Sequence, residues 1–85
     1  MNYRTIYKEY KADENGNYNE WVEVVAYNGD DKDEAFNHFV AMDGVWCAMS
    51  REGYGEYEYG YNDVTNTMWG KFTVEGVTRE IVYFG

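Results

Sequence analysis

The sequence contains no proline, one cysteine, one histidine and only seven basic residues. Without proline, no slow X-Pro isomerisation is expected during folding. The lone Cys47 excludes a disulfide within the chain and is typical of a reducing compartment, so we expect a cytoplasmic protein. No apolar run approaches the ~20 residues that span a membrane, and none near the N-terminus resembles a signal peptide. We therefore expect no membrane partner.

Few residues could carry catalysis or hold a metal ion. A Cys/His hydrolase would need His38 and Cys47 close together. His38 falls off the apolar stripe of its predicted helix, and Cys47 is interpreted as a small core residue. The acidic cluster at residues 30–34 is explained by a solvated helix N-terminus, and no phosphate-loop, dinucleotide or zinc spacing is present. The sequence predicts no enzyme, no cofactor and no metal site.

Aromatic residues and acidic charge are abundant. The 85 residues make one domain, 1–85, and a fifth of them are aromatic, including ten tyrosines, which argues against disorder. Net charge is −9, and it is unevenly placed. Residues 13–63 hold thirteen acidic residues against two basic ones, a net of −11. Such a field repels nucleic acid and attracts basic surfaces, so direct nucleic-acid binding is not expected.

The first segment has helical spacing of its apolar residues but residue types that favour strands. Asn15-Gly16 favours a hairpin. Both central positions of a two-residue hairpin turn need φ > 0, and Asn-Gly is a preferred pair at these positions. We predict strands at about 2–12 and 18–27. The predicted register pairs Lys11 with Glu20, Tyr10 with Trp21, Lys8 with Glu23, Tyr7 with Val24 and Ile6 with Val25.

A helix is predicted after Asn28-Gly29, with Asp30 or Asp31 as its cap and a capping box at 31–34. Its predicted inward stripe is Ala35, Phe36, Phe39 and Val40. Gly44 is a natural stop, and a buried strand is then expected at 45–50. The alternative is one longer helix through to residue 51, stopped by Gly53.

The segment 54–63 contains four tyrosines, three carboxylates, two glycines and no base. It is expected to be a loop or an irregular edge strand, which as a strand would place Tyr57, Tyr59 and Tyr61 on one face and Glu56 and Glu58 on the other.

A second hairpin is predicted around Glu75-Gly76, between strands 67–74 and 77–84. Its predicted register pairs Lys71 with Glu80, Thr73 with Thr78, Trp69 with Val82 and Phe72 with Arg79. The expected core face carries Met68, Phe72, Val74, Ile81 and Tyr83. The predicted fold class is α+β, in the order β-β-α-β-β-β, with one helix packed on a mostly antiparallel sheet.

Ten tyrosines exceed what one helix on one sheet can bury. Tyrosine is enriched at protein interfaces, and its ring takes cations on its face while carboxylates pair with them. We therefore expect a partner-binding surface aimed at a larger protein with a basic surface. The candidate residues are Tyr54, Glu56, Tyr57, Glu58, Tyr59, Tyr61, Asp63, Asp30, Asp31, Asp33 and Glu34.

At residues 54–63, preceded by the acidic 30–34 segment, the chain loosely resembles the small acidic inhibitors encoded by bacteriophages, such as anti-CRISPR and anti-restriction proteins. The resemblance implies a non-enzymatic inhibitor in the host cytoplasm, whose carboxylates stand where a nuclease complex expects nucleic-acid phosphates. Two alternatives stay open. One is a small-ligand sponge, for a nucleotide-like molecule, that uses stacked aromatics. The other is a structural homo-oligomeric subunit, such as a homodimer, paired through an exposed strand edge.

Overall fold

The computed structural model describes residues 2–12, 14–15 and 17–85, with the backbone alone for residues 12 and 18–21. The elements, in chain order, are β1 (Tyr3–Ala12), β2 (Tyr18–Gly29), α1 (Lys32–Arg51), β3 (Glu56–Asn62), β4 (Thr67–Val74) and β5 (Val77–Phe84). The predicted α+β class and the order β-β-α-β-β-β are confirmed. The strand that follows the helix is Glu56–Asn62, and not the predicted strand at 45–50.

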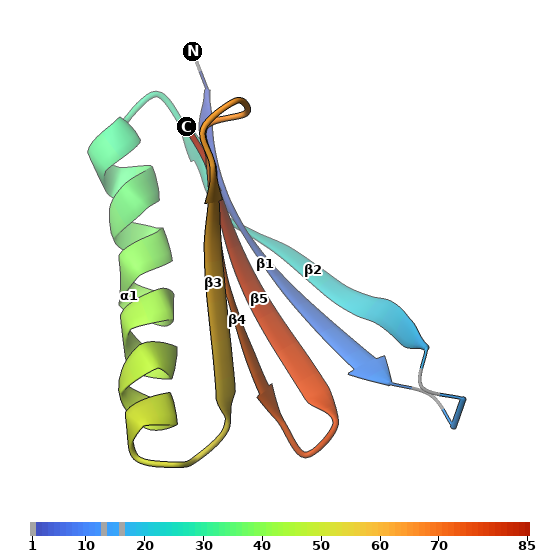
Figure 1. Cartoon of the computed structure of the whole chain (residues 1–85). Coiled ribbons are helices and arrows are strands. Elements are labelled where there is room, and N and C mark those ends of the chain that lie inside the picture. Colours follow the sequence, from blue (N-terminus) through green and yellow to red (C-terminus); the bar gives the residue numbers. More distant parts are fainter. Residues whose placement is uncertain (1, 13, 16) are drawn as a thin grey trace.

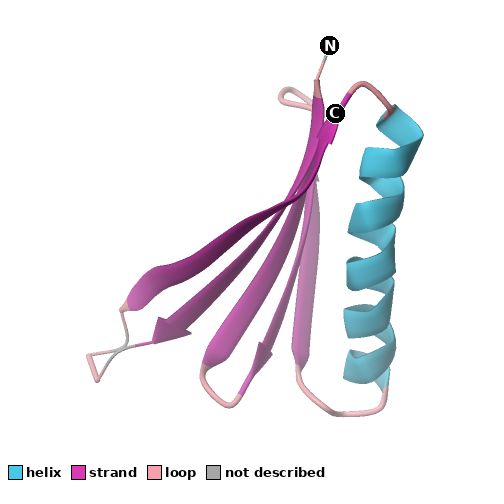
Figure 2. Cartoon of the chain, turned by 180° about the vertical axis from the view of Figure 1, so that it is seen from behind, coloured by secondary structure: helices cyan, strands magenta, loops and turns pink. Residues whose placement is uncertain are grey.

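The strands form one antiparallel sheet in the order β2-β1-β5-β4-β3. Helix α1 lies along one face, and the other face carries no element in the described part of the chain (Figure 2). The sheet twists so that the β1–β2 hairpin diverges from the helix, while both chain ends lie together at the opposite end (Figure 1). Antiparallel sheets tolerate such one-sided coverage because alternate side chains can face water.

The second hairpin has the predicted register at every predicted pair. Glu75 and Gly76 have φ of 52° and 78°, as a two-residue turn of this kind requires. The hydroxyls of Thr73 and Thr78 lie 2.9 Å apart, and Lys71 Nζ lies 3.8 Å from Glu80 Oε2. The turn residues alone were therefore enough to fix which side chains share a face.

The first hairpin keeps the predicted register only in part. Ile6 pairs with Val25, Tyr7 with Val24 and Lys8 with Glu23, as predicted. A register shift between Glu9 and Tyr10 then moves the remaining pairs by one residue. The predictions that Tyr10 opposes Trp21 and that Lys11 opposes Glu20 are wrong, because Tyr10 opposes Glu20 and Lys11 opposes Asn19. Gly16 of the predicted turn lies outside the described residues.

Helix α1 runs well past its predicted end. Asp31, one of the two predicted candidates, is the N-cap, and its carboxylate accepts a hydrogen bond from the Glu34 N–H at 3.1 Å. The strand predicted at 45–50 is wrong, since these residues are helical. The helix ends at Arg51, and Gly53, whose φ is +84°, follows its C-cap Glu52. The N–H groups of Gly53 and Tyr54 donate to the carbonyls of Ser50 and Met49, which satisfies the last turn.

Burial explains why Gly44 does not stop the helix. A glycine within a helix costs about 1 kcal/mol relative to alanine, whereas burying a large apolar side chain contributes about 1.5–3 kcal/mol. Trp46, two residues later, is 4% exposed and stacks on Phe72 of β4 at a ring distance of 6.3 Å. Continuing the helix is the arrangement that brings Trp46 to the sheet.

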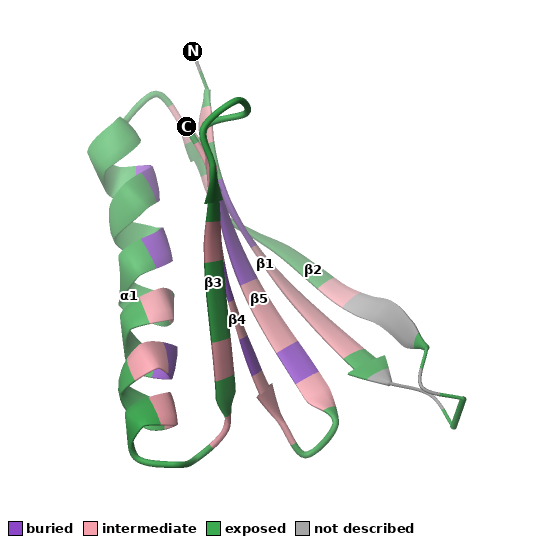
Figure 3. Cartoon of the chain, viewed as in Figure 1, coloured by how far each residue is buried: buried purple, intermediate pink, exposed green. Residues whose placement is uncertain are grey.

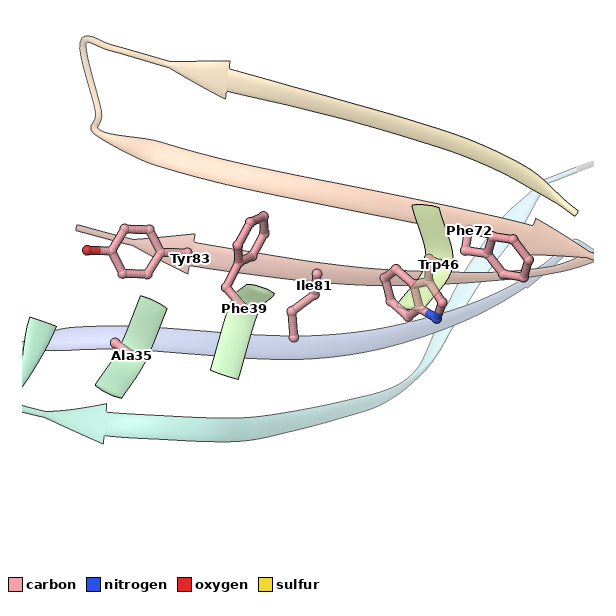
Figure 4. Close-up of a cluster of buried hydrophobic side chains, with 6 residues drawn as sticks. All are labelled: Ala35, Phe39, Trp46, Phe72, Ile81 and Tyr83. Atoms are coloured by element: carbon pink, nitrogen blue, oxygen red, sulfur yellow. The ribbon is translucent and has the colours of Figure 1, made fainter. Parts of the chain in front are cut away.

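The core lies between α1 and the central strands, where buried positions face one another (Figure 3). It consists of the side chains drawn in Figure 4, namely Ala35, Phe39, Trp46, Phe72, Ile81 and Tyr83. The predicted core face of the second hairpin is confirmed, with Met68 and Val74 partly buried against this cluster.

The predicted helix stripe needs correction. Ala35 and Phe39 are buried, but Phe36 and Val40 remain exposed at its margin. The stripe instead continues towards the C-terminal end through Trp46, which a helix ending at Gly44 could not include. No helix in the described part of the chain has the length and apolar content needed to cross a membrane.

Candidate functional site

The acidic, tyrosine-rich segment forms an edge of the sheet. Strand β3 pairs with β4 over all seven of its residues without a register shift, and it has no strand neighbour on its outer side among the described residues. Alternation along the strand sends Tyr57, Tyr59 and Tyr61 to the helix side, and sends Glu56 and Glu58 to the open face, as predicted. The two kinds of side chain therefore flank the edge from opposite faces.

The three tyrosines on the helix side differ in how far they are engaged. The Tyr57 hydroxyl donates to Asp43 Oδ1 of α1 at 2.5 Å. Tyr59 stacks on Tyr57 at a ring distance of 5.7 Å and is 75% exposed. Tyr61 is 58% exposed and donates to Asn66 Oδ1 at 3.1 Å. Tyr57 thus anchors the strand, and Tyr59 and Tyr61 present their rings to solvent.

Asp43 is a residue that the sequence reasoning missed. It is half-buried on the sheet-facing side of α1, and a Cβ atom added at Gly70 of β4 would clash with its Oδ1. Burial and the adjacent Asp43 carboxylate raise the pKa of Tyr57 above its ordinary value of 10.0. The available signal was the position of Asp43 four residues after Phe39, on the sheet-facing side of the predicted helix.

A row of alternating charge crosses the open face of the sheet. In strand order from β2 to β3, the cross-strand neighbours in this row are Glu23, Lys8, Glu80, Lys71 and Glu58. Opposite charges on neighbouring strands stabilise a sheet by roughly 0.2–1 kcal/mol per pair. The row therefore begins and ends on a carboxylate, one at each edge of the sheet.

An apolar row runs beside the charged row. Ile6 and Val82 are 7% and 8% exposed, although no element covers this face in the described structure. Val82 opposes Trp69, which in turn opposes Gly60 on β3. A Cβ atom added at Gly60 would clash with the indole Cζ2 of Trp69, so the ring reaches across to the β3 edge. Lys71 Nζ lies 5.1 Å from the centre of the same ring.

The open face also has a hollow of about 470 Å³ beside β3. It is lined by Tyr10, Glu56, Glu58, Lys71, Thr73 and Thr78. Glu56 and Glu58 make no ion pair among the described residues, whereas Lys71 already pairs with Glu80. The hollow is polar and acidic on its β3 side, and it suits a cationic group better than an anionic one.

The remaining candidate residues lie beyond the two ends of β3. Helix α1 begins at the end of the molecule where β3 finishes, so the helix N-terminus lies far from Glu56 (Figure 1). The acids of that terminus are Asp30, Asp31, Asp33 and Glu34. Tyr54 lies in the connection before β3 and Asp63 in the turn after it, and both are exposed. The acidic helix end therefore lies at the end of the molecule where β3 finishes, away from Glu56 at the start of the strand.

The two residues considered for catalysis are not near each other. His38 and Cys47 lie nine residues apart on α1, which is about 13 Å along a helix axis. The His38 ring stacks on Tyr27 of β2 at 5.7 Å, while Cys47 lies on the flank that faces Tyr57 of β3. No group of three or more His, Cys, Asp or Glu residues is placed to hold a metal ion in the described part of the chain.

The fold and the edge surface define a class of protein rather than a family, namely a small α+β domain with one helix on an antiparallel sheet and an acidic, tyrosine-bearing edge strand. Comparison with protein-family models, with curated proteins and with solved structures gave no match.

Proposed function

We propose that the chain is a non-enzymatic binding protein that docks the β3 edge on a basic surface of a larger protein. The observation that carries this proposal is the exposure of Tyr59 and Tyr61 on the edge strand that also bears Glu56 and Glu58. Tyrosine supplies contact area with little loss of side-chain entropy, and carboxylates supply charge-assisted hydrogen bonds to Lys and Arg.

The charge distribution supports the same surface. The segment from Glu52 to Asp63 carries four acidic residues and no base. The nearest basic side chain across the sheet, Lys71, lies close to Glu80 and to the Trp69 ring. The carboxylates of β3 are therefore available to a partner, and their field speeds association with a basic surface at low salt.

The sharper form of the proposal is inhibition of a nucleic-acid-processing complex, such as a defence nuclease. Glu56 and Glu58 would take the place of phosphates in its basic channel, as in the anti-CRISPR and anti-restriction inhibitors that the sequence loosely resembles. The partner is then a nucleic-acid-binding effector, and this chain makes no contact with nucleic acid itself.

The test is binding to nuclease effectors across a salt series. The double variant Glu56→Lys with Glu58→Lys should lower affinity at least tenfold at low salt, since it reverses both charges on the open face of the edge. The double variant Asp30→Lys with Asp33→Lys makes the same change of net charge at two exposed sites near the helix N-terminus, at the end of the molecule away from Glu56, and should have a smaller effect. Affinity that is independent of salt, or equal losses in the two variants, would contradict docking through β3.

A homo-oligomeric subunit is a second candidate, favoured by an exposed apolar flank of α1. This flank faces β2, because His38 on the same side stacks on Tyr27. Its exposed apolar side chains are Met42, Val45 and Met49 on the helix, with Val24 on β2. Light scattering over a range of concentrations tests this alternative, and a monomer at high concentration excludes it.

A further inference from the structure

The two edges of the sheet are not equivalent. The β2 edge belongs to a hairpin with two register shifts, which twist a strand and disrupt its outward pairing. The β3 edge has an unbroken register over seven residues and contains neither lysine nor proline, which are common blocking residues on edge strands. The outer backbone N–H and C=O groups of β3 are thus the better template for a further strand.

The charged row on the open face predicts which charge a further strand would carry beside β3. Signs alternate from Glu23 on β2 to Glu58 on β3, so the next position outward calls for a cation. Glu56, one alternate position along the same strand, faces the same side and makes no ion pair among the described residues. A strand beside β3 would therefore place basic residues opposite both carboxylates.

We propose that the partner supplies an extended segment that adds to the sheet as a sixth strand beside β3, with Lys or Arg at alternate positions facing Glu56 and Glu58. The intervening residues are apolar or aromatic and face Tyr57, Tyr59 and Tyr61. This inference rests on the proposed function and adds to it the form of the recognised segment. Main-chain hydrogen bonds supply affinity in such strand addition, and alternate side chains supply specificity.

The surroundings of Gly60 add a third open-face position to the predicted pattern of the recognised segment. The Trp69 indole lies across Gly60 and reaches the β3 edge on the open face. A partner side chain opposite Gly60 would meet this ring, whose face attracts a cation such as an Arg guanidinium. The recognised segment is therefore basic at two successive open-face positions and packs on Trp69 at the third.

A second copy of the chain fits this edge less well. Strand β3 contains no basic residue, so no pairing of β3 with another β3 can place a cation opposite Glu58. Strand β2, the other edge, also contains no basic residue. Charge complementarity thus favours a different protein over self-association.

The experiment uses the full chain, isotopically labelled, and two synthetic peptides of equal composition. In one peptide lysine alternates with valine, and in the other the lysines are grouped together. The alternating peptide should bind at least tenfold more tightly, with amide shifts concentrated in residues 56–62. Glu58→Lys should abolish this preference, and a peptide with glutamate in place of lysine should restore binding to the double variant Glu56→Lys with Glu58→Lys. Glu23→Lys, at the other end of the same charged row, is the matched control and should retain binding.

The outcomes separate this inference from the proposed function. If the two peptides bind equally, and if this binding is lost at high salt and in the Glu56/Glu58 variants, strand addition is overturned. Electrostatic docking through β3 would then remain. Absence of binding by either peptide at low salt overturns both. Shifts in residues 56–62 that depend on protein concentration without peptide would make a second copy the occupant and overturn the proposed partner.

Discussion

The hydroxyl of Tyr57 on β3 donates to the carboxylate of Asp43 on α1 across 2.5 Å, and this contact ties the exposed edge strand to the helix. Asp43 lies over Gly70 of β4, where only a residue without a side chain leaves space for it. The proposed binding edge is therefore held in position by a polar contact at the margin of an otherwise apolar core.

Removing this hydrogen bond should destabilise the fold. Tyr57→Phe leaves the half-buried Asp43 carboxylate without its donor and should lower the free energy of unfolding by about 1–3 kcal/mol. Urea unfolding measures this loss. In an Asp43→Ala background the same substitution should cost much less, and equal costs in the two backgrounds would show that the hydrogen bond contributes nothing.

Stability should fall at alkaline pH. Burial, followed by the Glu9 carboxylate, raises the pKa of Tyr7 to about 12, and burial with Asp43 raises that of Tyr57 above 10.0. Both phenols keep their protons in the folded state when the unfolded state has lost them, so their stabilisation is present below about pH 10 and is lost as pH rises towards about 12. Urea midpoints measured against pH should decline over this window, and less steeply in Tyr7→Phe with Tyr57→Phe. An identical slope in that variant would contradict the assignment.

Two glycine-to-alanine substitutions should change the stability of the fold in opposite directions. Gly70→Ala places a Cβ atom against Asp43 Oδ1, closer than van der Waals contact allows, and should cost about 1–3 kcal/mol. Gly44 lies inside α1, and a Cβ atom added there would meet nothing within 4 Å apart from its chain neighbours and the backbone of its own helix. Gly44→Ala should therefore stabilise the protein by about 0.5–1 kcal/mol. Thermal unfolding compares them directly. A stabilising Gly70→Ala would refute the tight approach of Asp43 to the sheet.

Removal of two buried hydroxyl groups, one at a time, should have different effects on stability. The Tyr83 hydroxyl is buried and has no hydrogen-bond partner among the described residues, so Tyr83→Phe should leave stability unchanged or raise it by about 1 kcal/mol. The Thr5 hydroxyl donates to the Ala35 carbonyl at 2.6 Å, and Thr5→Val should lower stability by about 1 kcal/mol. Each variant loses one hydroxyl, which makes them controls for each other. A destabilised Tyr83→Phe would point to a partner for that hydroxyl.

Much of the sheet could be predicted because local chemistry determines it. The two-residue turn at Glu75-Gly76 needs positive φ. Once this turn is placed, it determines every cross-strand pair from Thr73–Thr78 to Trp69–Val82. The register of the first hairpin was predictable only between Ile6 and Glu9, since the register shifts on either side depend on how the strand bends against its neighbours. The alternation of tyrosines and glutamates on β3 likewise follows from the strand period of two.

The sequence by itself determined the acidic charge, the surplus of tyrosine, the second hairpin and a helix cap at Asp30 or Asp31, because each depends on residue type or on contacts within a few positions. Only the tertiary structure decided that α1 continues through Gly44, because the burial of Trp46 against Phe72 outweighs the local cost of a glycine. It also decided that the acidic helix end lies away from Glu56, at the end of the molecule where β3 finishes, and that β3 ends a row of alternating charge. Those relations depend on strand order and on the packing of the helix, which act over distances that local sequence patterns do not encode.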